Sequence, residues 1–209
     1  MAGWLPCTRR KDVRMADYTT APEVRAMVSD SDMVTEGSYD ALLGTFISAA
    51  SRLIDRYVGG WDNYFVASDE HERWFDGSGE RKLWIDAAVS ITAVDDHSKA
   101  LVIDTDYVEF PYNHRRIGRP ITRLDLLSGR FSSGARSIKI TGVWGYSEEP
   151  PETIAMACRI QSMRWFMRAK GGFEDAQASA AVGQMFYTQE LDPDVKLLLE
   201  PYRVENTVL

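Results

Sequence analysis

The side chains best suited to chemistry in this 209-residue chain are three histidines, two cysteines and a few neighbouring carboxylates. His71 stands among acidic residues in the run Asp69-Glu70-His71-Glu72, whose composition could suit a metal site. Consecutive residues of a strand or turn point in different directions, however, and no second histidine follows at helical spacing. We therefore expect a solvated loop and no bound metal.

The other arrangements that catalysis requires are missing from the sequence. The close acidic residues at 95–96 and at 104–106 stand among turn residues, which favours solvated turns over a carboxylate site. Gly77-Ser78-Gly79 lacks the spacing of a hydrolase nucleophile elbow. Cys158 falls on an apolar helix face and is interpreted as a small buried hydrophobe. No P-loop or dinucleotide-binding glycine motif occurs, so we expect neither an enzyme nor a cofactor.

A basic cluster between His114 and Pro120 is the best candidate for contact with nucleic acid. This cluster and the residues just after it supply four arginines that could lie along phosphates: Arg115, Arg116, Arg119 and Arg123. No aromatic residue is interleaved within the cluster, and the preceding sequence is strongly acidic. These features favour pairing of the arginines with an acidic protein surface, with direct contact to DNA as the alternative.

Charge is distributed unevenly along a chain whose net charge is −7. Residues 62–109 hold twelve acidic and four basic residues, a net charge of −8, whereas residues 111–139 have a net charge of +6. Residues 173–209 return to −5. The acidic and basic stretches either face each other within one sheet or form two faces of a subunit that stacks against copies of itself.

Capping residues and apolar periodicity predict four helices, at about 22–28, 39–58, 152–170 and 192–200. Between the second and the third, β-branched and aromatic residues predict strands over about 72–146, with Gly77-Ser78-Gly79 joining two of them into a hairpin. The predicted fold class is α+β, mainly a helical bundle with an inserted antiparallel β-rich middle. The expected organisation is an N-terminal arm at 1–18, a domain at 19–172 that contains the β-rich insertion 62–146, and a tail at 173–209.

The helix at 152–170 is apolar on two faces. One face is a narrow stripe at i, i+4, i+7 and i+11, and a broader apolar face contains Cys158 and Phe166. Because a chain of this size has few elements to cover both faces, we expect the stripe to contact a neighbouring subunit, with burial in the core as the alternative. The candidate interface consists of the stripe and two adjacent arginines: Met156, Ile160, Met163, Met167, Arg164 and Arg168.

The sequence also limits where the protein acts. No run of about 18 apolar residues is present, so we expect no membrane span, and the first residues do not follow the pattern of a secretory signal. Cys7 and Cys158 are far apart in the chain and belong to different kinds of segment, so we expect no disulfide framework, which fits a reducing compartment.

Taken in order, several segments of the chain resemble the head–tail connector (adaptor) proteins of tailed bacteriophages. These segments are SYDALLGTFISAASRLIDRYVGG, RWFDGSG, KLWIDAAVSITAV, DYVEFP and IKITGVWGYSEEPPETIAMACRIQSMRWFMR. The strand that ends at Gly142-Val143-Trp144-Gly145-Tyr146, followed by Pro150-Pro151 and a helix, is the most specific of them. The ending from Asp192 to Arg203 also resembles that family.

The resemblance implies a structural protein with no catalytic residues. It implies a homo-oligomeric ring of about twelve copies in the virion neck, assembled in the host cytoplasm, which joins the portal to a stopper or tail-completion protein. The ring would continue the DNA channel, so contact with double-stranded DNA would be transient. The tail would be mobile in the free protein and would dock on the portal through Val195, Leu197, Leu198, Leu199, Tyr202 and Arg203.

Two other functions are alternatives to a connector. One is a monomeric nucleic-acid-binding module that uses the basic 114–123 loop, and the other is an unrecognised small hydrolase.

Overall fold

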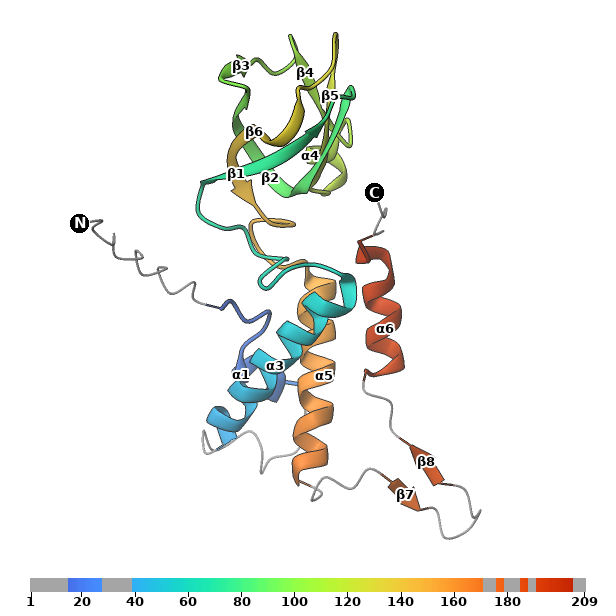
Figure 1. Cartoon of the computed structure of the whole chain (residues 1–209). Helices are drawn as coiled ribbons and strands as arrows, with labels where there is room; N and C mark the ends of the chain where they lie inside the picture. Colours follow the sequence, from blue (N-terminus) through green and yellow to red (C-terminus); the bar gives the residue numbers. More distant parts are fainter. Residues whose placement is uncertain (1–14, 28–38, 171–175, 179–184, 188–190, 205–209) are drawn as a thin grey trace, which may run out of the picture.

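The computed structural model describes residues 15–27, 39–170, 176–178, 185–187 and 191–204. These residues form two regions that lie end to end (Figure 1). The helical region contains the helices that pack around α5, and the sheet region is the strand-rich segment between residues 71 and 144. The chain enters the sheet region after one long helix and leaves it into another, so the sheet region is an insertion between them.

The helical region has four helices among the described residues: α1 (Ala21–Arg25), α3 (Asp40–Val58), α5 (Glu152–Lys170) and α6 (Pro193–Leu199). Each of the four predicted helices is therefore present, although α1 ends earlier than expected. Helix α3 stops at Gly59 because that residue takes the left-handed conformation, with φ of 82°, which favours glycine. Asp192 caps the start of helix α6, and its carboxylate accepts a hydrogen bond from the backbone N–H of Asp194.

The sheet region contains six strands: β1 (His71–Ser78), β2 (Lys82–Asp96), β3 (Lys99–Leu101), β4 (Tyr107–Phe110), β5 (Ile121–Leu126) and β6 (Ser133–Trp144). Their order is β1-β6-β2-β5-β4, with β3 paired to β2, and all of these pairings are antiparallel. A short helix, α4 (His114–Ile117), connects β4 to β5. A separate pair, β7 (Ala176–Ala178) and β8 (Met185–Tyr187), lies before α6.

The expectation of a mainly helical bundle was wrong. Helices make up only 36% of the structure, and the six-stranded sheet is a substantial second region with its own interior. The sequence prediction underestimated the sheet because it treated the strands over 72–146 as an insertion into a helical bundle. The α+β class itself is correct.

The predicted hairpin around Gly77-Ser78-Gly79 was also wrong. Strands β1 and β2 are consecutive, yet β1 pairs with β6 and β2 pairs with β3, β5 and β6. Strand β6 lies between β1 and β2, and it approaches β2 closely at Gly142. A Cβ atom at that position would lie 2.5 Å from the carbonyl oxygen of Ser90. Long-range pairing with β6 therefore replaced the local hairpin.

Each region has its own hydrophobic core. In the sheet region, Leu124, Ile138, Ile140 and Trp144 belong to a cluster of buried residues. In the helical region, the buried cluster draws on α1, α3, α5 and α6, and on Tyr18 from the described end of the predicted N-terminal arm. Residues 1–14 of that arm lie outside the described residues.

Aromatic residues connect the two cores. Phe65, in the loop after α3, packs edge-on against Tyr18, with ring centroids 5.7 Å apart, and against Tyr202 at the same distance. Tyr146, which follows β6, has its ring centroid 5.4 Å from those of Phe65 and of Tyr202. The end of the sheet region is thereby packed against the segment that follows α6.

Candidate assembly surfaces

The residues considered for metal binding are engaged in other contacts. The Nδ1 atom of His71 lies 2.8 Å from the carbonyl oxygen of Asp69, and its Nε2 atom accepts a hydrogen bond of 3.2 Å from Arg73. Within the described residues, no group of three or more histidine, cysteine or acidic side chains is arranged to hold a metal ion.

Cys158 lies in the interior of the helical region, between Ser51 on α3 and Ser162 one turn along α5. Burial raises the pKa of its thiol, so the reactive thiolate is disfavoured. This environment suits a packing residue and not a nucleophile.

The methionine stripe of α5 lies on the less buried side of that helix. Met156 and Met167, at its two ends, are exposed over 37% and 45% of their surfaces. Ile160 and Met163, between them, are half-buried against the edge of the helical core. The other apolar face, which includes Cys158 and Phe166, is buried. One side of α5 therefore packs in the core while the stripe remains partly open in a single chain.

The two arginines beside the stripe are both half-buried. Arg164 forms an ion pair with Asp192, the residue that caps α6, and the backbone N–H of Asp192 donates a hydrogen bond to Gln161. Arg164 thus fixes the start of α6 on α5. Arg168 lies one turn further along α5, and the assignment of both arginines to a subunit contact remains a prediction.

The proposed portal-docking residues are divided between the interior and the surface. Val195 and Leu199 are buried in the chain's own core, and Leu198 packs against its edge. Leu197 faces away and is 76% exposed. Tyr202 packs on Phe65, and the Arg203 guanidinium lies over the ring of Tyr57. In this conformation Leu197 and Arg203 are the residues of the set most open to a partner.

Three of the four predicted basic residues are brought together on the surface. Arg115 and Arg116 lie on α4, and Arg119 follows the left-handed turn at Gly118. All three are exposed, and no salt bridge holds them within the part of the chain that is described. Arg123, on β5, differs from them.

Arg123 is part of a local packing arrangement on the sheet. Its guanidinium donates two hydrogen bonds to the carboxylate of Asp125, at 2.6 and 2.9 Å. The same group lies over the ring of Phe110, 3.8 Å from the centroid, and near the ring of Trp84. Arg123 is therefore held in place and is a poor candidate for phosphate contact.

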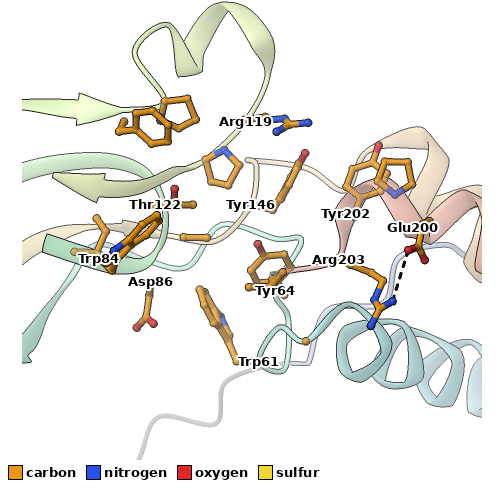
Figure 2. Close-up of a pocket in the computed structure, with 18 of the residues that line it drawn as sticks. Trp61, Tyr64, Trp84, Asp86, Arg119, Thr122, Tyr146, Glu200, Tyr202 and Arg203 are labelled. Atoms are coloured by element: carbon orange, nitrogen blue, oxygen red, sulfur yellow. Dashed lines mark ion pairs between the residues drawn. The ribbon is translucent and has the colours of Figure 1, made fainter. Parts of the chain in front are cut away.

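A broad cleft of about 1190 Å³ separates the sheet region from the end of the helical region (Figure 2). Aromatic rings line it: Trp61, Tyr64, Trp84, Tyr146 and Tyr202. Arg119 projects at the sheet side of the cleft, while Glu200 and Arg203 pair with each other at the opposite side. The sequence prediction missed this cleft because its residues come from segments that are distant in the chain.

A cluster of polar side chains, centred on the buried carboxylate of Asp55, attaches the N-terminal segment to α3. The Tyr18 hydroxyl donates a hydrogen bond to the carboxylate of Asp55, which also accepts the backbone N–H of Asn63 at 3.1 Å. Arg52 forms an ion pair with the same carboxylate and donates a hydrogen bond to the Ala16 carbonyl. Burial raises the pKa of Asp55, and burial together with the neighbouring carboxylate raises that of Tyr18. The arrangement is a structural anchor, because no substrate-accessible group takes part.

Comparison with solved structures identifies the fold. A chain in the neck of an empty GTA particle, computed with C6 symmetry, matches with a TM-score of 0.50 and 15% identity. That match covers 87% of this chain and 86% of the other. A chain in the virion of a native gene transfer agent (GTA) particle matches with a TM-score of 0.50 and 17% identity, over 87% of each chain.

This chain has the fold of a phage-like neck protein. The resemblance to head–tail connector proteins is thereby confirmed at the level of the fold. No protein-family model matches the chain, and no curated protein matches it either. Among the described residues, no helix is both long and apolar enough to span a membrane.

Proposed function

We propose that this protein is a structural subunit of a neck ring that joins a portal to the tail of a phage-like particle. The observation that carries the proposal is the fold, which this chain shares over 87% of its length with a chain of a GTA neck. About twelve copies would surround a channel for DNA, in contact with the portal on one side and with a stopper or tail-completion protein on the other. A ring of twelve is compatible with the C6 symmetry of that neck structure.

Two surfaces of the chain support assembly into a ring. The α5 stripe exposes Met156 and Met167 on the outer side of a helix whose other side is buried, and methionine adapts well to irregular contacts. Leu197 exposes an apolar side chain on α6, within the segment that resembles the connector ending. The first surface suits contact with a neighbouring subunit and the second suits the portal. The ring would be assembled in the host cytoplasm and would act in the virion neck.

The absence of a catalytic role belongs to the same proposal. In the described residues, the groups that most resemble reactive centres are a buried thiol and a histidine with both ring nitrogens in contact with neighbours. The Ser68 hydroxyl lies 3.5 Å from the Nδ1 atom of His71, but that nitrogen contacts the Asp69 carbonyl oxygen while Nε2 accepts from Arg73, so the ring is not placed to take the hydroxyl proton. We expect no turnover of ester, phosphate or glycoside substrates.

The ring is tested by measuring assembly of the purified protein, alone and with its portal, by mass photometry and electron microscopy. We expect closed rings, and we expect Met156→Asp with Met167→Asp to remain folded while ring formation falls. Leu42→Asp is the control, because Leu42 is a similarly exposed apolar residue on α3, outside the stripe. A chain that remains monomeric with and without portal would contradict the proposed function.

A further inference from the structure

The surface around α4 has a composition that distinguishes it from an ordinary solvated loop. It is called here the α4 knob and consists of Tyr112, Arg115, Arg116, Ile117 and Arg119. Tyr112 and Ile117 are exposed over 56% and 53% of their surfaces, and the three arginines are exposed beside them. Tyrosine and arginine are enriched at protein interfaces, and an apolar centre with a charged rim is the usual arrangement there.

An exposed surface of opposite charge lies on strand β1. It is called here the β1 face and consists of Glu70, Glu72, Trp74 and Asp76. The alternation of β1 places Glu72 and Trp74 on one side. Glu70 directly precedes the strand, Asp76 stands at its irregularity between Phe75 and Gly77, and all four residues are exposed. Trp74 is 46% exposed at the centre, with carboxylates on either side. This surface therefore also combines an apolar centre with charges around it.

Neighbouring cations reduce the charge of the β1 face without cancelling it. Lys139 on β6 lies 3.3 Å from Glu72 and 3.3 Å from Asp95, so one ammonium group is shared by two carboxylates. Arg136 lies over the ring of Trp74. Together with Glu70 and Asp76, the surface carries four carboxylates against two cations and remains negative.

The two surfaces are complementary and do not overlap. Strands β1 and β4 stand at the two ends of the strand order, and α4 directly follows β4. A ring requires two different surfaces on each subunit, one that fits the other on the next copy. We propose that the α4 knob of one subunit docks on the β1 face of the next, with Tyr112 and Ile117 against Trp74 and the arginines against the carboxylates. This inference rests on the proposed ring.

The apolar groups favour a second copy of the chain over DNA as the partner. Arginines that follow a phosphate backbone do not need an exposed isoleucine beside them, whereas a protein contact buries such a residue. The complementary acidic surface is present on the same chain, which satisfies the requirement for a repeating contact. Charge pairs at such a contact fix its register and exclude wrong partners.

The test uses charge reversal in two halves. Arg115→Glu with Arg116→Glu reverses the knob, and Glu70→Arg with Glu72→Arg reverses the face. Each double variant alone brings like charges together, so we expect the protein concentration needed for half-assembly to rise by about tenfold or more. The chain that carries all four changes restores opposite charges, and we expect its assembly to return toward that of the wild type.

Mixing the two double variants provides a second measurement on chains that have not been reversed at both surfaces. When the two variants alternate around the ring, the reversed knob of the knob variant meets the reversed face of the face variant. The native knob of the face variant then meets the native face of the knob variant, so the mixture should assemble although neither protein does so alone. Lys99→Glu with Arg130→Glu is the matched control for the knob variant, because it makes the same change in charge as Arg115→Glu with Arg116→Glu at exposed residues outside both surfaces. Thermal unfolding verifies that every variant is folded.

The outcomes separate this inference from the proposed function. A wild type that forms rings, together with double variants that assemble equally well, contradicts the knob-to-face contact and leaves the ring intact. A different result would assign the knob to DNA and overturn the inference. In that case the knob variant fails to assemble, the fourfold variant does not recover assembly, and the knob variant no longer binds a DNA duplex. A wild type that never forms a ring contradicts both.

Discussion

The interior of the sheet region comes from one continuous segment between Leu83 and Trp144, whereas that of the helical region is gathered from separate segments between Tyr18 and Leu199. The sheet core is a cluster of apolar and aromatic residues. Both regions also enclose polar side chains: Asp55 and Gln161 are buried in the helical region, and Glu109 and Ser137 in the sheet region. A continuous segment needs no other part of the chain to complete its interior, while the helical region depends on the ends of the chain returning to it. We therefore expect the two regions to respond differently to damage.

The largest effect is expected at the centre of the sheet region. Trp144 is fully buried and its indole N–H donates a hydrogen bond of 3.0 Å to the carbonyl of His71. Trp144→Ala should lower the free energy of unfolding by about 3–5 kcal/mol. Loss of the sheet should also weaken the helical region, because an unfolded insertion then separates α3 from α5.

Denaturant unfolding followed by circular dichroism measures this effect. Trp84→Ala is the control, because Trp84 is 45% exposed, and it should cost less than about 1 kcal/mol. Equal losses for the two variants would show that Trp144 does not form the centre of a separate core.

The second effect tests whether α6 belongs to the helical core. Leu199 is buried and Leu197, on the same helix, is 76% exposed. Leu199→Ala should cost about 2–5 kcal/mol, and Leu197→Ala should be almost neutral. In Leu199→Ala, amide hydrogen exchange should show that α3 and α5 lose protection first. Strands β2 and β6 should stay protected, because the sheet core comes from one continuous segment. Simultaneous loss in both regions would remove the distinction between them.

This second effect also shows how much the sequence could predict. The boundaries of α3, α5 and α6 were predictable because caps and apolar periodicity are local signals. The sequence prediction placed residues 173–209 in a tail that would be mobile in the free protein, whereas the described part at 191–204 packs on α5 through Val195 and Leu199. Nothing in the local sequence indicates which helix will cover an apolar face.

In the sheet, too, local sequence predicts a single strand but not the strand with which it pairs. Strand β5 carries a clear alternation, Ile121-Thr122-Arg123-Leu124-Asp125-Leu126, which is a local signal that the sequence shows. The pairing of β1 with β6 could not be predicted from the glycine loop, because it depends on residues about 60 positions apart. The exposure of the α5 stripe was expected from its pattern, but the α4 knob and the aromatic cleft required the tertiary structure.

A third, smaller effect compares a tyrosine–aspartate hydrogen bond in each region. In the helical region, the hydrogen bond from the Tyr18 hydroxyl to Asp55 is buried. In the sheet region, the hydrogen bond of 3.0 Å from the Tyr112 hydroxyl to Asp125 is exposed. Tyr18→Phe should cost about 1–3 kcal/mol because a buried carboxylate loses a donor. Tyr112→Phe should cost less than about 0.5 kcal/mol, since water replaces the bond. Equal values from chemical denaturation would mean that the buried anchor does not stabilise the helical region.

The smallest effect concerns pH. Burial raises the pKa of the Glu109 carboxyl in the sheet region, against the opposing influence of His114 and Arg115. A raised pKa means that the folded state holds this proton more tightly than the unfolded state. The contribution to stability is therefore complete below the ordinary pKa of 4.5 and is lost as the pH rises through the raised value.

Glu109→Gln should remove that contribution to the pH dependence. One proton can change the slope of the unfolding free energy against pH by at most about 1.4 kcal/mol per pH unit. Comparing the unfolding free energies of the variant and the wild type from pH 4 to 7 measures it. Parallel curves would indicate that Glu109 titrates as it does in the unfolded chain.

The most direct test of the neck assignment is electron microscopy of the purified chain incubated with its portal. We expect closed rings of about twelve copies, seated on the portal, with an open central channel and with the α5 stripe and the α4 knob at contacts between subunits. Single chains that neither form rings nor associate with the portal would contradict it.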